Sequence, residues 1–226
     1  MVKIGESNMR PLVRSPRNGD FQSIEAPPLR SFYSTSRRRR FAGFTRALLT
    51  TVRPAPDEYA PYYGKYVSLV PDDEMNVIQH LADQHHESVD VLRKAKGKGD
   101  FSYSPGKWTI KEVLGHMCDT ERIMAYRALR FARGDKTDLA GFEQDDYVAT
   151  ANFNNRSMED LLEELWSVRA ATLSLAKHLP KESLTRRGVA SGNPVTVRAL
   201  FYIIAGHERH HIAILKERYG LQDHVL

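Results

Sequence analysis

Beyond the first 71 residues, apolar side chains return every three to four positions, which is the spacing of one face of an α-helix. This period predicts four long helices, over about 72–96, 109–133, 157–179 and 196–219. No convincing run of alternating apolar and polar residues accompanies them. The pattern therefore predicts an all-α fold, a four-helix bundle whose helices bury one face each.

Local signals mark the ends of these helices. Thr109 followed by Glu112 fits a capping box, in which two side chains bond the free backbone amides of a helix start. Ser157 is a suitable N-cap for the third helix, and Gly220 suits the left-handed residue that ends the fourth. The segment 134–156 between the second and third helices is polar and long for a bundle connection, and such loops are often functional.

The positive charge of the chain lies before the helices. Residues 1–53 contain one lysine and ten arginines against three acidic residues, a charge of +8, so the rest of a chain of net charge +5 carries −3. Nucleic-acid binding by the globular part is therefore not expected. The extension is interpreted as disordered or extraneous, with a targeting peptide and upstream sequence from a misassigned start as alternatives.

The domain organisation follows from this division. Residues 1–53 form the basic extension, and 54–226 form one helical domain. The segment 54–71, rich in proline and tyrosine, is expected to be an extended lead-in whose tyrosines lie across the domain surface.

Cys118 is the only cysteine, so intramolecular disulfides are excluded and a reducing compartment is expected. The thiol itself is expected to be a small buried group. No stretch approaches the roughly 20 apolar residues of a membrane span. The expectation is a cytoplasmic protein, with organelle import left open if residues 1–53 are a transit peptide.

Two histidines lie in the middle of the apolar stripe of the last helix. At 100° per residue, His211 is about 40° from His207, and Leu200, Ile203 and Ile204 fall on the same face. A histidine pair one turn apart can place two imidazole nitrogens on one divalent ion. Burying two such rings without partners would be costly, so the pair predicts a metal site.

A third ligand must come from another helix. His116 flanks the apolar stripe of the second helix, while His85 lies on the stripe of the first. The residues alone do not decide which of the two is the third ligand. His210 falls nearer the edge of its stripe and is expected to support the site or face solvent. The remaining histidines are expected to be solvated: His80, His86, His178 and His224.

The last helix also contains the metalloprotease pattern His-Glu-x-x-His, with Glu208 as the would-be general base. The third ligand of those enzymes commonly lies downstream. At the position where the extended pattern has its third histidine, this chain has Glu217. A metalloprotease therefore stays a remote alternative.

Four motifs occur in a specific order: Ser104–Thr109, Gly115–Asp119, Phe142–Tyr147 and Gly206–Ile212. In order and spacing they resemble the DinB-like superfamily, in particular its YfiT-like branch of proteins assigned as metal-dependent hydrolases. The resemblance covers roughly residues 65–220. It implies a four-helix bundle with a long crossover loop and a divalent ion held by His116, His207 and His211.

The resemblance also implies an activity. Members of this branch are linked to low-molecular-weight thiol transfer, including bacillithiol S-transferases, so a metal-dependent thiol S-transferase or hydrolase with a small-molecule substrate is expected. Three histidines suit Zn, Ni, Fe or Mn. Asp119, one turn beyond His116, is a weak candidate for a catalytic role. A non-catalytic metal- or small-ligand-binding bundle, connected with stress, is the alternative, and a homodimer is left open.

Overall fold

The computed structural model of the protein describes residues 52–73 and 75–222. The expectations for residues 1–51 and for His224 lie outside the described residues. The α-helices are α1 (Gly64–Val67), α2 (Val77–Arg93), α3 (Ile110–Ala132), α4 (Gln144–Ala151), α5 (Met158–Lys177) and α6 (Val197–Tyr219). The short 3₁₀ turns and strands are η2 (Pro56–Glu58), η3 (Pro61–Tyr63), η4 (Phe153–Asn155), η5 (Lys181–Thr185), β1 (Arg187–Ala190) and β2 (Asn193–Thr196).

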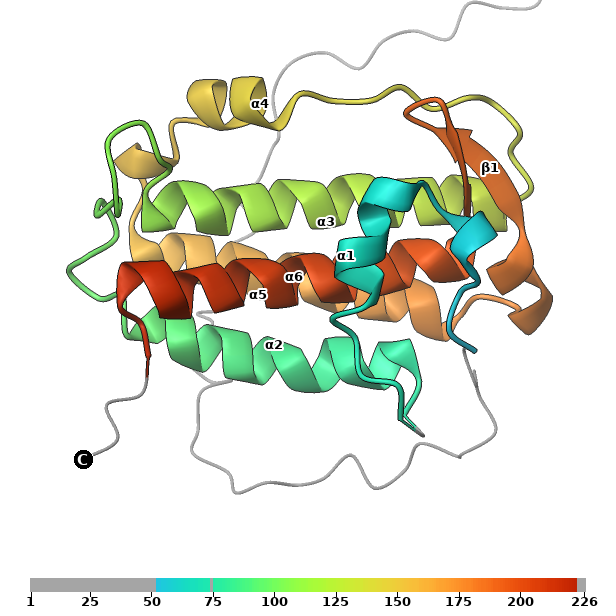
Figure 1. The fold of residues 1–226 in the computed structure, drawn as a ribbon, viewed down its shortest axis with the longest axis horizontal. Helices are drawn as coiled ribbons and strands as arrows, with labels where there is room; N and C mark the ends of the chain where they lie inside the picture. Colours follow the sequence, from blue (N-terminus) through green and yellow to red (C-terminus); the bar gives the residue numbers. More distant parts are fainter. Residues whose placement is uncertain (1–51, 74, 223–226) are drawn as a thin grey trace, which may run out of the picture. The chain divides into compact units, whose positions relative to one another are not determined.

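The helices α2, α3, α5 and α6 form a four-helix bundle (Figure 1). Both α5 and α6 pack against α2 and α3, so the four helices enclose one interior. Fully buried side chains from each helix fill it, among them Leu81, Leu114, Leu165 and Leu200. The connection from α3 to α5 returns along the bundle, so both helices start at the same end (Figure 1). The predicted fold class and its long crossover are confirmed.

Three of the predicted helix ends depend on the capping chemistry expected of them. Thr109 Oγ1 accepts from the Glu112 amide at 3.1 Å, and the Thr109 amide donates to Glu112 Oε2 at 2.7 Å, which completes the capping box. Ser157 accepts from the Asp160 amide in the same way. Gly220 ends α6 in the left-handed conformation, with φ of 68°.

The first long helix begins later than predicted. Asn76 caps α2 by accepting from the Gln79 amide at 3.0 Å, so the helix starts at Val77 and not at Asp72. Asp73 is used differently, because its carboxylate lies 3.0 Å from the ring of His80. His80 is consequently buried, and the expectation that it is solvated was wrong.

The long loop is folded against α3. It contains α4 and η4, and the η4 residue Phe153 packs onto α3 at Gly115. A β-carbon at position 115 would lie 2.4 Å from the Phe153 ring, so only glycine permits this approach. The loop therefore closes onto α3 directly beside His116.

The segment between α5 and α6 contains a short antiparallel hairpin. Strands β1 and β2 pair in a register that places Arg187 opposite Thr196. Ser191 and Gly192 between them both have positive φ, as a two-residue turn of type I′ requires. The hairpin also holds the crossover loop, because the Leu139 amide donates to the Val189 carbonyl at 2.9 Å.

The lead-in before α2 is anchored at two places. At the first, the buried Glu58 accepts from Thr196 Oγ1 at 2.8 Å and from Arg198 Nε at 2.7 Å, at the start of α6. Burial alone would raise the pKa of Glu58. Hydrogen bonds from Arg198, the Ala55 amide and Thr196 outweigh it and lower the pKa to about 2.

The second anchor is the contact of α1 with α6. A β-carbon at Gly206 would lie 1.9 Å from the carbonyl oxygen of Tyr66, so the absence of a side chain there allows the two backbones to meet. Of the lead-in tyrosines, Tyr62 is exposed, while Tyr59, Tyr63 and Tyr66 are half-buried. A bilayer-spanning segment is absent from the described helices, none of which has the required apolar length.

Candidate metal centre

The centre is built on α6, where His207 and His211 lie one turn apart and point into the bundle. The third ring, His116, comes from α3, the helix that packs against α6. All three side chains are buried, with 3%, 6% and 9% of the surface of His116, His207 and His211 exposed. The close packing of α3 and α6 thus brings together residues 91 positions apart in the sequence.

The rings converge through one type of nitrogen. Nε2 of His207 lies 3.0 Å from Nε2 of His116 and 3.1 Å from Nε2 of His211. One ligand nitrogen from each residue can be chosen so that all three lie within 4.8 Å of one another. Three nitrogens at this spacing can coordinate one divalent cation.

The electrostatics of the site favour neutral rings. Burial lowers the pKa of His116 to about 4. Burial, together with repulsion from neighbouring histidines and from Lys65, holds the pKa of His207 and of His211 well below the ordinary value. Near neutral pH the three rings are therefore unprotonated, which is the form that binds a metal ion.

Aromatic rings and one cation surround the cluster. The Trp108 ring lies 4.7 Å from the His116 ring, and the Tyr66 ring meets His207 edge-on at 5.4 Å and His210 at 5.3 Å. Lys65 Nζ lies 4.8 Å from the centre of the Tyr66 ring. Because α1 contacts α6 at Gly206, the lead-in supplies part of the wall of this site.

The weak candidate Asp119 lies apart from the three rings. Its carboxylate is 3.5 Å from Arg122 and close to Glu164 of α5. Burial, with a contribution from Glu164, raises the pKa of Asp119 despite the opposing effect of Arg122. The structure thus places Asp119 in a charge cluster between α3 and α5, and a catalytic role for it stays a prediction.

The competing histidine, His85, also lies outside the cluster. Its ring packs edge-on against the Trp166 ring at 4.2 Å, and neither of its nitrogens has a hydrogen-bond partner among the described residues. Burial, with the nearby charge of Arg169, lowers the pKa of His85 to about 4. The structure therefore joins His116, and not His85, to the pair on α6.

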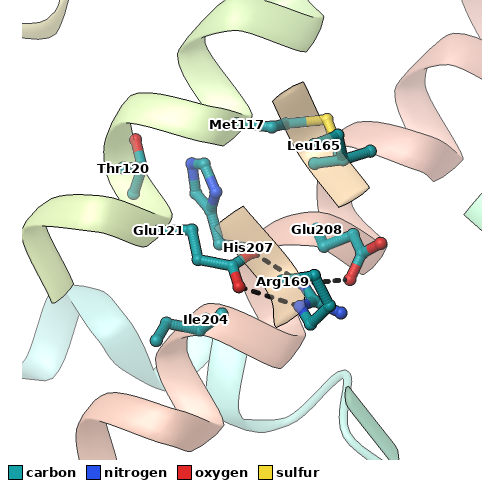
Figure 2. Close-up of a pocket in the computed structure, with 8 residues that line it drawn as sticks. All are labelled: Met117, Thr120, Glu121, Leu165, Arg169, Ile204, His207 and Glu208. Atoms are coloured by element: carbon teal, nitrogen blue, oxygen red, sulfur yellow. Dashed lines mark hydrogen bonds and ion pairs between the residues drawn. The ribbon is translucent and has the colours of Figure 1, made fainter. Parts of the chain in front are cut away.

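A second buried polar cluster lies directly beside the first. Arg169 of α5 donates Nε to Glu121 Oε1 at 2.8 Å, and Nη2 to Glu121 Oε2 at 2.7 Å and to Glu208 Oε2 at 2.8 Å (Figure 2). Its Nη1 donates to the Leu81 carbonyl at 2.7 Å. Gln84 of α2 donates to the same carboxylate oxygen of Glu208. We refer to Arg169, Glu121, Glu208 and Gln84 as the ionic cluster.

The ionic cluster was not predicted from the sequence. The one available signal was an arginine within the apolar face of the third predicted helix, where Arg169 is only 1% exposed. Its partners are 48 and 39 positions away, so no local pattern identifies them. The cluster also argues against a metalloprotease with the His-Glu-x-x-His pattern. Arg169 and Gln84 bind Oε2 of Glu208, and although burial alone would raise its pKa, the charge of Arg169 lowers it and makes this carboxylate a poor general base.

Comparison with known proteins gives a consistent result. A family model described as the DinB superfamily matches residues 62–215. A protein of Oceanobacillus iheyensis with the provisional name metal-dependent hydrolase is 26% identical over 117 residues. That match covers 51% of this chain and 66% of the relative, just under two thirds of the relative's own length.

Among solved structures, YfiT from Bacillus subtilis aligns with a TM-score of 0.54 at 15% identity. The alignment covers 75% of this chain and 92% of YfiT. YfiT is described as a probable metal-dependent hydrolase with an unusual four-helix bundle topology. At this level of identity the likeness supports the fold alone.

Proposed function

Since the chain belongs to the DinB superfamily, we propose that it is a metal-dependent enzyme whose divalent ion is held by the Nε2 atoms of His116, His207 and His211. The convergence of these three buried nitrogens is the observation that carries the proposal. We further propose that it transfers a low-molecular-weight thiol or hydrolyses a small substrate. The names of the relatives support metal-dependent hydrolysis, and the thiol is our extension.

The donor set fits a catalytic ion. Three neutral imidazoles supply three ligands and leave further coordination positions for water or substrate. When bound, such an ion polarises an electrophile, lowers the pKa of a bound water or holds a thiol as its thiolate. Three nitrogen ligands do not discriminate between Zn, Ni, Fe and Mn, so the availability of each metal determines which one is bound.

The surrounding side chains favour an anionic ligand. The groups with the largest electrostatic effect on the pKa of His207 and of His211 are other histidines and Lys65, and no carboxylate is among them. A divalent ion on neutral ligands keeps its full charge, and Lys65 adds to it. We therefore propose that the residues around the cluster select a thiolate or carboxylate, with Tyr66 and Trp108 limiting access of water.

Burial supports a second candidate. Because His116, His207 and His211 are at most 9% exposed, a metal ion among them would have little room for substrate. This observation favours a non-catalytic bundle that binds a metal or small ligand. A metalloprotease is disfavoured, because the carboxylate of Glu208 is occupied by the ionic cluster.

The metal assignment is tested by the double variant His207→Ala/His211→Ala, compared with His86→Ala/His178→Ala, which removes two exposed histidines. Elemental analysis is expected to show that the first variant loses its bound metal while circular dichroism shows a retained fold, and that the control keeps its metal. Stoichiometric metal in the first variant would contradict the assignment.

The two candidate functions are separated by activity. The metal-loaded protein is incubated with several thiols and monochlorobimane as the electrophile, and the conjugate is followed by fluorescence. Turnover that depends on the metal supports the transferase. Metal binding without turnover over this panel and over ester and amide substrates supports the binding protein.

A further inference from the structure

A small cavity lies between His207 and the ionic cluster. Its volume is about 10 Å³, and its walls include Thr120 of α3, Arg169 of α5, and His207 and Glu208 of α6 (Figure 2). A cavity of this size holds about one water molecule, provided that polar partners are available. Whether a water occupies the cavity therefore depends on the polar atoms in its wall.

Two residues of the wall carry buried polar atoms that lack a partner. Within the described chain, neither Thr120 Oγ1 nor Glu208 Oε1 has a hydrogen-bond partner. Thr120 is 4% exposed and Glu208 is 3% exposed. Leaving such buried groups without a partner is costly, so native proteins rarely do so without an ordered water.

His207 presents a third polar atom. Both recorded hydrogen-bond contacts of its ring, to His116 and to His211, are made by Nε2. In a neutral ring that uses Nε2 for a metal, the proton is on Nδ1 and needs an acceptor. His207 forms part of the cavity wall, so a water in the cavity is the candidate acceptor for this proton.

We propose that one buried water molecule occupies this cavity and holds His207 in its orientation as a ligand. The water accepts from His207 Nδ1–H and from the Thr120 hydroxyl, and it donates to Glu208 Oε1. Three partners are the usual number for a buried water. The effect on metal binding rests on the proposed function, whereas the presence of the water does not.

The proposal gives Glu208 a role that the protease pattern does not. Arg169 fixes Oε2 of the carboxylate at 2.8 Å, and Oε1 has no partner within hydrogen-bond distance among the described residues. The Ser88 hydroxyl acts on the same carboxylate and helps to lower its pKa. When Nδ1–H is hydrogen-bonded to a carboxylate through a water, the opposite ring nitrogen becomes a better metal ligand. Thr120 and Glu208 are therefore positioning residues that act on the metal through His207.

The test uses Thr120, because its substitution leaves the ionic cluster intact. Thr120→Val removes the hydroxyl at nearly constant volume, and Thr120→Ser restores it. The matched control is Thr172→Val, which removes another buried hydroxyl, one that donates to the Val168 carbonyl of its own helix at 3.1 Å. Cobalt affinity of each apoprotein is measured by competitive titration, together with the visible spectrum of bound cobalt.

We expect Thr120→Val to weaken cobalt binding about tenfold and to change the spectrum, because partners of metal-ligating histidines contribute about 10–100-fold to affinity. Thr120→Ser is expected to remain within about twofold of the parent, and Thr172→Val to be unchanged. Equal affinities for Thr120→Val and Thr172→Val would overturn the proposal.

The water is observed separately in the metal-free protein by a high-resolution crystal structure. Density for one water within hydrogen-bond distance of Thr120 Oγ1 and Glu208 Oε1 is expected, and a dry cavity overturns the proposal even if the variants differ. If the parent protein binds no cobalt, the proposed function fails, and the crystal structure alone decides whether the water is present.

Discussion

The histidine cluster and the ionic cluster are neighbours, because His207 and Glu208 are consecutive residues of α6. Both clusters are buried, but they differ in how completely their polar atoms are paired. In the ionic cluster every guanidinium nitrogen of Arg169 has an acceptor. In the histidine cluster three nitrogens of the same kind face one another across 3.0 and 3.1 Å. The protein itself supplies the partners of Arg169, whereas the three histidine nitrogens have only one another as neighbours.

This difference suggests different roles: the ionic cluster stabilises the fold, and the histidine cluster binds a ligand. Burial of Arg169 is compensated by two carboxylates and a carbonyl oxygen, so the cluster connects α2, α3, α5 and α6. Burial of three neutral acceptors is compensated only when a cation arrives. Removing a member of the ionic cluster should therefore impair folding, and removing a histidine should impair metal binding.

The largest effect is expected from Arg169→Met, which leaves Glu121 and Glu208 buried without their cation. The free energy of unfolding should fall by about 3–5 kcal/mol, as for other buried ion pairs that lose one partner. Urea denaturation measures it. Arg93→Met, at an exposed arginine paired with Asp90, should change stability by less than about 1 kcal/mol. A loss below about 1 kcal/mol in Arg169→Met would show that the two clusters do not differ as described.

His116→Ala is the converse experiment. It should lower metal affinity about 100-fold or more by removing one of three ligands, while the metal-free protein keeps most of its stability. Competitive titration and thermal unfolding measure the two properties, with His178→Ala as the exposed control. Unchanged affinity would exclude His116 from the site and reopen the choice of third ligand.

A smaller effect is expected from Glu58→Gln, which extends the comparison to another internally satisfied charge. Because its pKa in the folded protein, about 2, lies below the ordinary 4.5, the ionised carboxylate stabilises the fold above pH 4.5, and this stabilisation is lost as the pH falls toward 2. The variant should lose about 2 kcal/mol at pH 7 and much less at pH 3. Urea denaturation at both pH values measures this loss in the free energy of unfolding, with Glu87→Gln as an exposed control. An equal loss at both would refute the charge-based explanation.

The smallest effect is expected from Lys65→Met, which probes the charge beside the histidine cluster. Binding of 3-mercaptopropionate to the cobalt-loaded protein, read from the sulfur-to-cobalt absorption, should weaken about threefold, since an exposed lysine contributes less than about 1 kcal/mol. Binding of 2-mercaptoethanol, which has no carboxylate, should be unchanged. Lys98→Met serves as the control. If both thiols lose affinity equally, Lys65 does not select an anion.

The sequence predicted the features that depend on local geometry. The helical period identified the bundle, and Thr109, Ser157 and Gly220 marked helix ends because capping involves neighbouring residues. His207 and His211 were paired on one helix by the same reasoning. These predictions needed no knowledge of how the helices pack.

Features that depend on packing between distant segments were not accessible in this way. The choice of His116 over His85 needed the resemblance, because both flank or lie on apolar stripes and only tertiary packing separates them. The ionic cluster was missed for the same reason. The hairpin before α6 was missed because its strands are short and contain Gly188 and Pro194, which are poor strand formers.

The contact of α1 with Gly206 has a practical consequence for the design of shortened proteins. A clone trimmed to begin at α2 would keep the residues of the four long helices and the three histidines proposed as ligands. It would lose Tyr66 and Lys65, and the face of α6 at Gly206 would be open to solvent. If the proposed ion is bound, a shortened bundle would present it without Tyr66 and Lys65 beside it, so the start of the clone would influence which ligands a screen identifies.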